Sequence, residues 1–193
     1  MNEPMKLMEE LNSIHSPGQK KRLCAGAAAV QDEALEAMLA QAGPIAGPDE
    51  AGWRRVEFTR GFPEAVAARL RALGAAEKEL TRQDAFAVWG EADTLTICAN
   101  DKRGWLYGAC DVLWQAQNNK GLVEGGLRFA SPQCPFRGLK MYLPAPDALD
   151  QFYKVVDMLV YYRYNAVILE IGGAMEYKRH PEINESWIEY CRE

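Results

Sequence analysis

The stretch from Phe136 to Gly173 constrains the fold of this chain more than any other part of it. It opens with a short apolar run that ends at Pro144, a residue type that commonly follows the end of a strand. A second run, AVILEIG, follows Asn165 and is apolar without alternation, as in strands buried on both faces of a parallel sheet. The segment has about the length of a right-handed strand–helix–strand unit. We therefore expect two parallel strands joined by a helix.

The residues between the two runs predict the helix. Asp147 stands where an N-cap residue is expected. Apolar residues then recur at offsets of three and four, which places them on one face of a helix: Phe152, Val155, Val156, Leu159 and Val160.

The residues before this unit predict a different architecture. Residues 4–14 have helical spacing, and Ser16-Pro17-Gly18 would end such a helix. Candidate strands and helices alternate from there on: a weak strand at 23–30, a helix at 32–41, a strand at 53–59, a helix at 63–73, a hairpin over 85–99, a helix at 102–118, a short strand at 121–123 and an extended piece at 126–135. In the 102–118 helix, Leu106 and Leu113 lie on a broad apolar face, and Gly104 and Gly108 lie on the other side.

This order predicts three parts. Residues 1–19 form an N-terminal helical extension, and residues 20–133 form an α+β domain with a small antiparallel or mixed sheet. Residues 134–193 begin an α/β segment built on the strand–helix–strand unit.

Charge and composition exclude several classes of function. The net charge is −5, and the longest basic run is Lys20 to Arg22, so we expect no nucleic-acid partner. No stretch reaches the length of a membrane span, and the acidic N-terminus is unlike a signal peptide. The five cysteines are widely spaced, with no CxxC pair, which favours reduced thiols. We therefore expect a cytoplasmic protein with no membrane partner, no metal and no cofactor.

Two segments resemble a known family. DTLTICANDKRGWLYGACDVLWQ, followed by CPFRGLKMYLP, resembles the beginning of the family 20 glycoside hydrolases, the β-N-acetylhexosaminidases. The resemblance covers about residues 85–170. In that family a small α+β domain of zincin-like fold precedes a catalytic (β/α)8 barrel. The resemblance therefore implies that the α+β domain is hexosaminidase-like and that the later unit is the first βαβ unit of a TIM barrel. Its implied ligand is a carbohydrate with a terminal amino sugar.

The resemblance also suggests two substrate-binding residues. The arginine of the family's Arg-Gly pair contacts sugar hydroxyls, and it matches Arg137. Glu170 lies near the carboxyl end of the second strand, where barrel active sites are built, and could accept hydrogen bonds from a sugar. Ordinary structural roles are equally open, because Arg137 could pair with an acid and Glu170 with Arg137 or Lys140. The family's aspartate and Arg-His pair are replaced by Met141 to Pro144, which makes the amino-sugar specificity itself uncertain.

The family's catalytic Asp-Glu pair follows the fourth barrel strand and is not matched in this sequence. The hydrolysis uses the substrate's own acetamido group, an exception to the usual two-carboxylate scheme. We therefore expect a truncated piece of a glycosidase with no catalytic residue, inactive alone, which self-associates through its incomplete barrel. The alternatives are a non-catalytic carbohydrate-binding or assembly module and a complete small α/β enzyme with an unrecognised site.

Overall fold

A computed structural model describes residues 11–23, 52–144, 146–170 and 189. The chain divides into two compact units, Met1–Pro135 and Phe136–Glu193, called unit 1 and unit 2 below. The strand expected at 23–30, apart from Leu23, the helix at 32–41 and residues 1–10 lie outside the described residues. No helix in the described part of the chain is long and apolar enough to span a bilayer.

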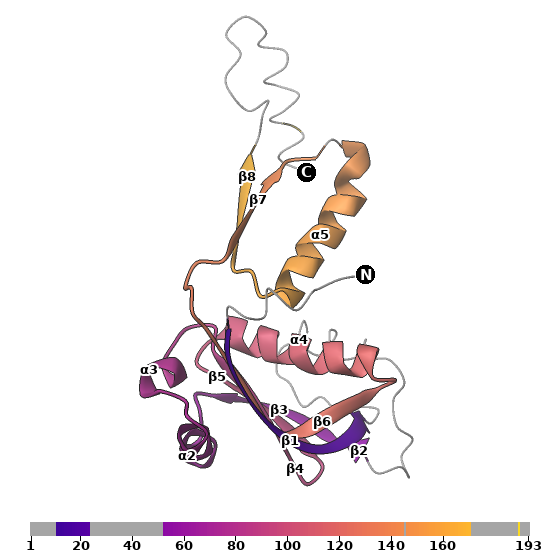
Figure 1. The fold of residues 1–193 in the computed structure, drawn as a ribbon. Helices are drawn as coiled ribbons and strands as arrows, with labels where there is room; N and C mark the ends of the chain where they lie inside the picture. The colour runs from indigo at the N-terminus through magenta and orange to yellow at the C-terminus, as the bar shows by residue number, and fades with distance from the viewer. Residues whose placement is uncertain (1–10, 24–51, 145, 171–188, 190–193) are drawn as a thin grey trace, which may run out of the picture. The chain divides into compact units, whose positions relative to one another are not determined.

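Unit 1 is built on a mixed six-stranded sheet with the order β2-β1-β6-β4-β5-β3 (Figure 1). Its strands are β1 (Leu11–Leu23), β2 (Gly52–Trp53), β3 (Arg55–Arg60), β4 (Phe86–Glu91), β5 (Thr94–Ala99) and β6 (Leu122–Pro132). Its helices are α2 (Glu64–Ala72), α3 (Glu77–Leu80) and α4 (Lys102–Asn118). The mixed sheet, the 85–99 hairpin and the helices near 63–73 and 102–118 are confirmed.

The prediction of a helix at 4–14 is wrong for residues 11–14, the part of that range that the structure describes. Residues 11–23 form the long strand β1, which runs antiparallel to β6, so residues 11–19 belong to the sheet and not to a helical extension. Pro17 and Gly18 do not end the strand, because the register shifts between Pro17 and Lys20 and absorbs them. The short strand and the extended piece expected at 121–135 form one strand, β6.

Glycines allow close packing where β1 pairs with β6 and around the Trp53 ring. Gly126 has φ +81°, and a Cβ added there would lie 2.2 Å from the Ser16 carbonyl oxygen. Added Cβ atoms at Gly90 and Gly125 would each lie 2.7 Å from the Trp53 ring. The buried Trp53 indole donates a 2.9 Å hydrogen bond to the Val123 carbonyl. Because Gly90, Gly125 and Gly126 have no side chains, β1 and the Trp53 ring can pack closely against β6.

Helices cover both faces of the sheet in unit 1. On one face, α2 and α3 contribute Val66, Leu70 and Leu80 to a buried cluster with Leu127 and Phe129. On the other face lies α4, whose first turn is capped by the Asp101 carboxylate, which accepts a 2.9 Å hydrogen bond from the Gly104 N–H.

The predicted placement of the α4 glycines is wrong. Cβ atoms added at Gly104 and Gly108 would lie 2.6 Å from Ala99 and 2.4 Å from Ile97, so both glycines face the sheet. Their lack of a side chain lets α4 approach β5 closely.

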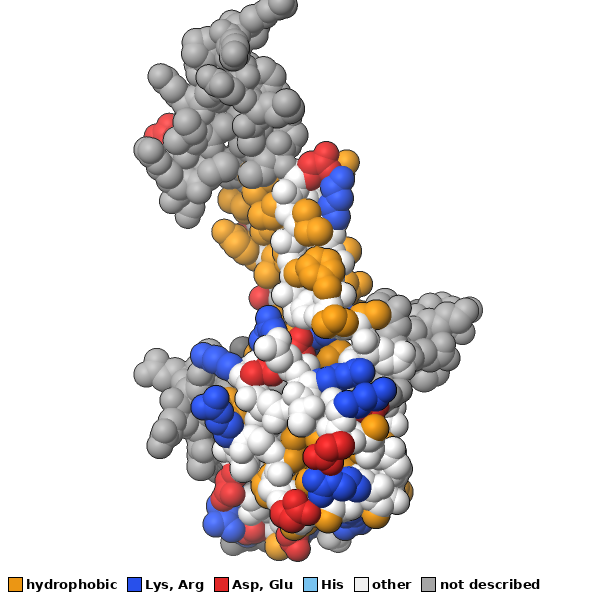
Figure 2. Space-filling view, turned by 90° about the vertical axis from the view of Figure 1, so that its left-hand side faces the viewer, with side chains coloured by type: hydrophobic (Ala, Val, Ile, Leu, Met, Phe, Trp, Pro, Cys, Tyr) orange, Lys and Arg blue, Asp and Glu red, His pale blue; other side chains and the backbone are white. Residues whose placement is uncertain are grey.

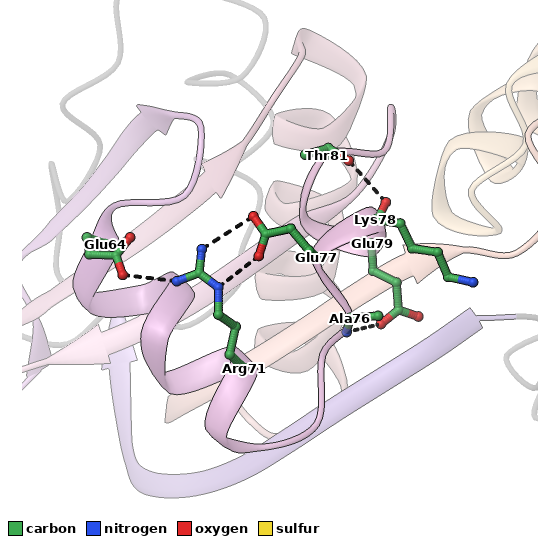
Figure 3. A network of polar contacts seen from close by, with 7 residues as sticks. All are labelled: Glu64, Arg71, Ala76, Glu77, Lys78, Glu79 and Thr81. Carbon is green, nitrogen blue, oxygen red and sulfur yellow. Dashed lines mark hydrogen bonds and ion pairs between the residues drawn. The ribbon is translucent and has the colours of Figure 1, made fainter.

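Exposed ion pairs join α2 to α3 (Figure 3). The Arg71 guanidinium lies between two carboxylates, 2.9 Å from Glu64 and 2.8 Å from Glu77. The hydrogen bond from Arg71 and its charge hold the pKa of Glu77 below its usual range. In the same view the Ala76 N–H donates to Glu79 at 2.8 Å, which caps the short helix α3.

Unit 2 contains the expected strand–helix–strand unit. It consists of β7 (Gly138–Tyr142), a 3-10 turn over Pro146–Ala148, α5 (Leu149–Tyr161) and β8 (Ala166–Glu170), and β7 and β8 are parallel. The predicted N-cap is wrong, since Asp147 lies in the 3-10 turn and α5 begins after Ala148 without a side-chain cap. The predicted apolar stripe of α5 is confirmed, because all its members are half-buried or buried and Leu159 is only 6% exposed.

Candidate functional site

The carboxyl ends of β7 and β8 bring three polar side chains together in unit 2. The register pairs Tyr142 with Glu170 at this edge, and Lys140 pairs with Ile168 one step earlier on the same face. The Lys140 ammonium forms an ion pair with the Glu170 carboxylate. The same ammonium lies 5.7 Å from the centroid of the Tyr142 ring. An aromatic face, a carboxylate and an ammonium therefore share one surface.

The backbone holds this edge in place. The Leu143 N–H donates a 3.1 Å hydrogen bond to the Glu170 carbonyl, which continues the β7–β8 pairing beyond the last paired residues. The side chains themselves are accessible to solvent: Tyr142 is 70% exposed, and the side chains of Lys140 and Glu170 are 60% and 41% exposed. The Glu170 Oε2 atom that pairs with Lys140 is itself buried, so a ligand would meet the Tyr142 ring, the Lys140 ammonium and the exposed part of the Glu170 side chain.

Arg137 lies at the opposite end of the strands. Its Nε donates a 2.7 Å hydrogen bond to the Arg163 carbonyl, and its N–H donates to the Asn165 side chain at 2.8 Å. The Asn165 N–H returns a 2.9 Å bond to the Arg137 carbonyl. These contacts tie the turn after α5 to the start of β7.

The structure does not bring the two sequence-predicted site residues together. Arg137 precedes β7, and Glu170 is paired with the last residue of β7. At about 3.3 Å per residue, their backbones are about 16 Å apart along the strands. Of the partners considered for Glu170, the structure shows Lys140.

The sequence prediction missed Lys140 and Tyr142 as members of a site. A weak signal for them was present, since residues two apart in a strand lie on the same face. Nothing in the sequence alone showed that this face also carries Glu170, because that depends on the register between β7 and β8.

Unit 1 holds a second polar cluster, between α4 and β6. The Arg128 Nε lies 2.9 Å from an Asp111 carboxylate oxygen, and these side chains are only 12% and 17% exposed. The Gln115 amide donates to the same oxygen at 3.0 Å and accepts from the Glu124 N–H at 3.1 Å. These contacts attach α4 to the sheet, which is a structural role.

The sequence matches no family model, and the comparison with curated proteins found no match. Solved structures do match. A glycoside hydrolase family 20 β-N-acetylglucosaminidase superposes with a TM-score of 0.53 and 14% identity, over 82% of this chain and 29% of its own. A Streptomyces plicatus β-hexosaminidase mutant in complex with the product GlcNAc gives 0.53 and 15%, over 80% and 32%. A family 20 β-N-acetylhexosaminidase from Streptomyces coelicolor gives 0.52 and 16%, over the same shares.

This chain has a fold like that of part of the family 20 enzymes. The identity is low, so the likeness concerns the fold alone. The chain spans about 30% of the length of these hexosaminidases. The family resemblance noted over residues 85–170 is accompanied by a fold likeness over most of the chain.

Proposed function

We propose that this chain is part of a family 20-like glycoside hydrolase that removes terminal amino sugars from glycans. The observation that carries the proposal is the fold likeness over 80% or more of the chain to three structures of this family, one of them with GlcNAc bound. The motif resemblance in α4 and β7 points to the same family. No other function is favoured by both sequence and fold.

In this proposal the two units have distinct roles. Residues 11–133, which extend the predicted 20–133 domain by most of β1, form the zincin-like small domain. Residues 134–193 form the first βαβ unit of a TIM barrel. The proposal keeps a cytoplasmic location, which the wide spacing of the five cysteines favours.

Glu170 and Arg137 are the proposed sugar contacts. Glu170 lies at the carboxyl edge of the strands, where the active sites of barrel enzymes are built. Arg137 matches the sugar-binding arginine of the family and carries a planar guanidinium suited to two hydroxyls. The structure places Arg137 at the other end of β7, where its Nε donates to the Arg163 carbonyl, so this sugar contact rests on the family resemblance alone.

The chemistry itself is proposed to come from residues outside this sequence. In a substrate-assisted mechanism the acetamido oxygen attacks the anomeric carbon, while a carboxylic acid protonates the departing glycosidic oxygen. Water then opens the cyclic intermediate with retention. The chain on its own is expected to hydrolyse nothing.

The test is to read the coding sequence around this chain and assay the complete product on nitrophenyl N-acetylhexosaminides. Release of nitrophenol, lost when an Asp-Glu pair after a later strand is mutated, is the expected result. Full expression of the complete product with no hydrolysis of any hexosaminide would contradict the proposal.

One observation favours a second function, an assembly module. Eight of the large hydrophobic side chains exposed on the described residues belong to unit 2, among them Phe136, Val167, Ile168 and Leu169. An apolar surface of this kind is covered either by more of the same protein or by another molecule. Light scattering on the 193-residue chain tests this function: a single oligomer of fixed stoichiometry supports an assembly module, whereas association of variable size is expected from an incomplete barrel.

A further inference from the structure

We propose that Lys140, Tyr142 and Glu170 form a subsite for a neutral pyranose, with vicinal hydroxyls bound by the Lys140–Glu170 pair and the sugar ring lying on Tyr142. This inference rests on the proposed function and names how that site would hold its sugar. It adds Lys140 and Tyr142, neither of which comes from the family resemblance, to the predicted Glu170.

The geometry places the three groups as a diol receptor requires. The ammonium of Lys140 contacts both other residues, the carboxylate through an ion pair and the phenol ring at 5.7 Å. An acceptor and a donor are therefore adjacent, and an aromatic face lies beside them. All three stand on one face of two hydrogen-bonded strands, so their relative positions are fixed by the β7–β8 register.

Each group has a separate chemical task. One sugar hydroxyl donates a hydrogen bond to the Glu170 carboxylate, and the oxygen of the neighbouring hydroxyl accepts a hydrogen bond from the Lys140 ammonium. Both are charge-assisted hydrogen bonds, which are stronger than neutral ones. The apolar C–H face of the pyranose covers the exposed Tyr142 ring and removes both surfaces from water.

The pairing of the charges selects a neutral sugar. The carboxylate and the ammonium cancel each other, so the pair offers no net charge to a uronic acid. A sugar carboxylate that approached Lys140 would compete with Glu170 and be repelled by it. Hydroxyls can bind the pair without separating it.

The same pair contributes little to folding. Exposed ion pairs add little net stability because water screens them, and Lys140 and Tyr142 are both largely in solvent. Substitution of these residues should leave the fold unchanged, so a loss of binding can be assigned to the site.

The experiment is a titration of the 193-residue chain with methyl N-acetyl-β-D-glucosaminide, followed by amide chemical shifts. We expect saturable shifts at residues 140–143 and 168–170 with a Kd of about 1–10 mM. Tyr142→Ala should weaken binding about 5–10-fold and Tyr142→Phe by less than about 2-fold, since only the ring is needed. Glu170→Gln should weaken it about 3–10-fold.

Two controls make the result specific. Tyr153→Ala, which removes a 56% exposed tyrosine from α5, should not change the affinity. Methyl β-D-glucuronide should bind at least about 3-fold more weakly than the neutral sugar. Absence of shifts at these amides, unchanged affinity in Tyr142→Ala, or a preference for the glucuronide would each overturn the subsite.

The outcome is separable from that of the proposed function. Hydrolysis by the complete product without binding at these residues would leave the enzyme proposal standing and refute this site. Binding here, without hydrolysis by the complete product, would retain the site and refute the enzyme.

Discussion

Units 1 and 2 differ in how far their own residues cover their apolar side chains. All but one of the buried hydrophobic residues among the described positions lie in unit 1, and the exception is Leu159. In unit 2 the strand β8 exposes Val167, Ile168 and Leu169 by 41–50%, on both faces, so the burial expected for this strand from its sequence is not found among the described residues. Figure 2 shows the same contrast, with hydrophobic side chains crowded over unit 2 and charged ones spread over unit 1.

The difference follows from the two sheet types. The mixed sheet of unit 1 has helices on both faces, which together bury Leu70, Val112 and Ile97. A parallel pair such as β7–β8 is normally buried on both faces by further strands and helices. Unit 2 supplies one α-helix among its described residues. The stability of unit 2 should therefore depend more than that of unit 1 on additional cover for its apolar side chains.

The largest expected effect is on two matched strand leucines. Leu127→Ala removes a fully buried side chain from the core of unit 1 and should lower the free energy of unfolding by about 2–5 kcal/mol. Leu169→Ala, at a position 42% exposed, should lower it by less than about 1 kcal/mol. Amide hydrogen exchange read separately in each unit measures both. An equally large loss at Leu169 would mean that β8 is covered in solution, and the contrast would fail.

A second pair of variants tests how much the close contact between β1 and β6 contributes to the stability of unit 1. Gly126 and Gly61 both have positive φ, +81° and +75°, but only at Gly126 would a new Cβ meet backbone. Gly61→Ala should cost about 1–2 kcal/mol from conformation alone. Gly126→Ala should cost about 1–3 kcal/mol more, because β1 must move away from β6. Urea unfolding followed by tryptophan fluorescence gives both values, and equal costs would show that the close crossing is not needed.

These glycines also explain what the sequence could not predict. Local sequence patterns sufficed for α4, α5, the hairpin and the two parallel strands: helical spacing or alternation for the first three, and uninterrupted apolar runs for the strands. The strand β1 was missed because Pro17 and Gly18 resemble a break until Gly126 is known to lie against Gly18. Similarly, Gly104 and Gly108 look like a solvent face until β5 is placed beside them.

The same limit applies to the candidate site: its local features could be predicted from the sequence, and its long-range contacts could not. Glu170 was found from its place at the end of an apolar strand, a local feature. Its distance from Arg137 and its contact with Lys140 depend on the register of two strands almost thirty residues apart in sequence. Contacts of that range leave no periodic trace in a single sequence.

Thiol labelling should separate the core of unit 1 from its edge. Burial raises the pKa of the Cys98 thiol to about 12, so at pH 8 only about one molecule in 10⁴ carries the reactive thiolate there. Cys134, near the end of unit 1, is exposed. A brief pulse of iodoacetamide, with peptides identified by mass spectrometry, should modify Cys134 and leave Cys98 intact until urea unfolds the unit. Rapid labelling of Cys98 in the native protein would show that this core opens locally.

The smallest expected effect comes from an exposed ion pair of unit 1 rather than from a buried side chain. Because the pKa of Glu77 is lowered in the folded state, its pair with Arg71 stabilises unit 1 above the ordinary carboxyl pKa. That contribution is lost as the pH falls through the lowered pKa. Glu77→Gln should therefore slightly lower the melting temperature at neutral pH and leave it unchanged in acid, whereas Glu91→Gln, at the exposed end of β4, serves as the control.

Thermal scans from pH 7 down to pH 3 at low and high salt measure this difference, which salt should reduce. If Glu77→Gln proved as harmful as Leu127→Ala, unit 1 would depend on its surface as much as on its core. The contrast between the units would then have to be explained by charge. The Arg71–Glu77 pair lies at the surface, so we expect the opposite, since water screens both groups.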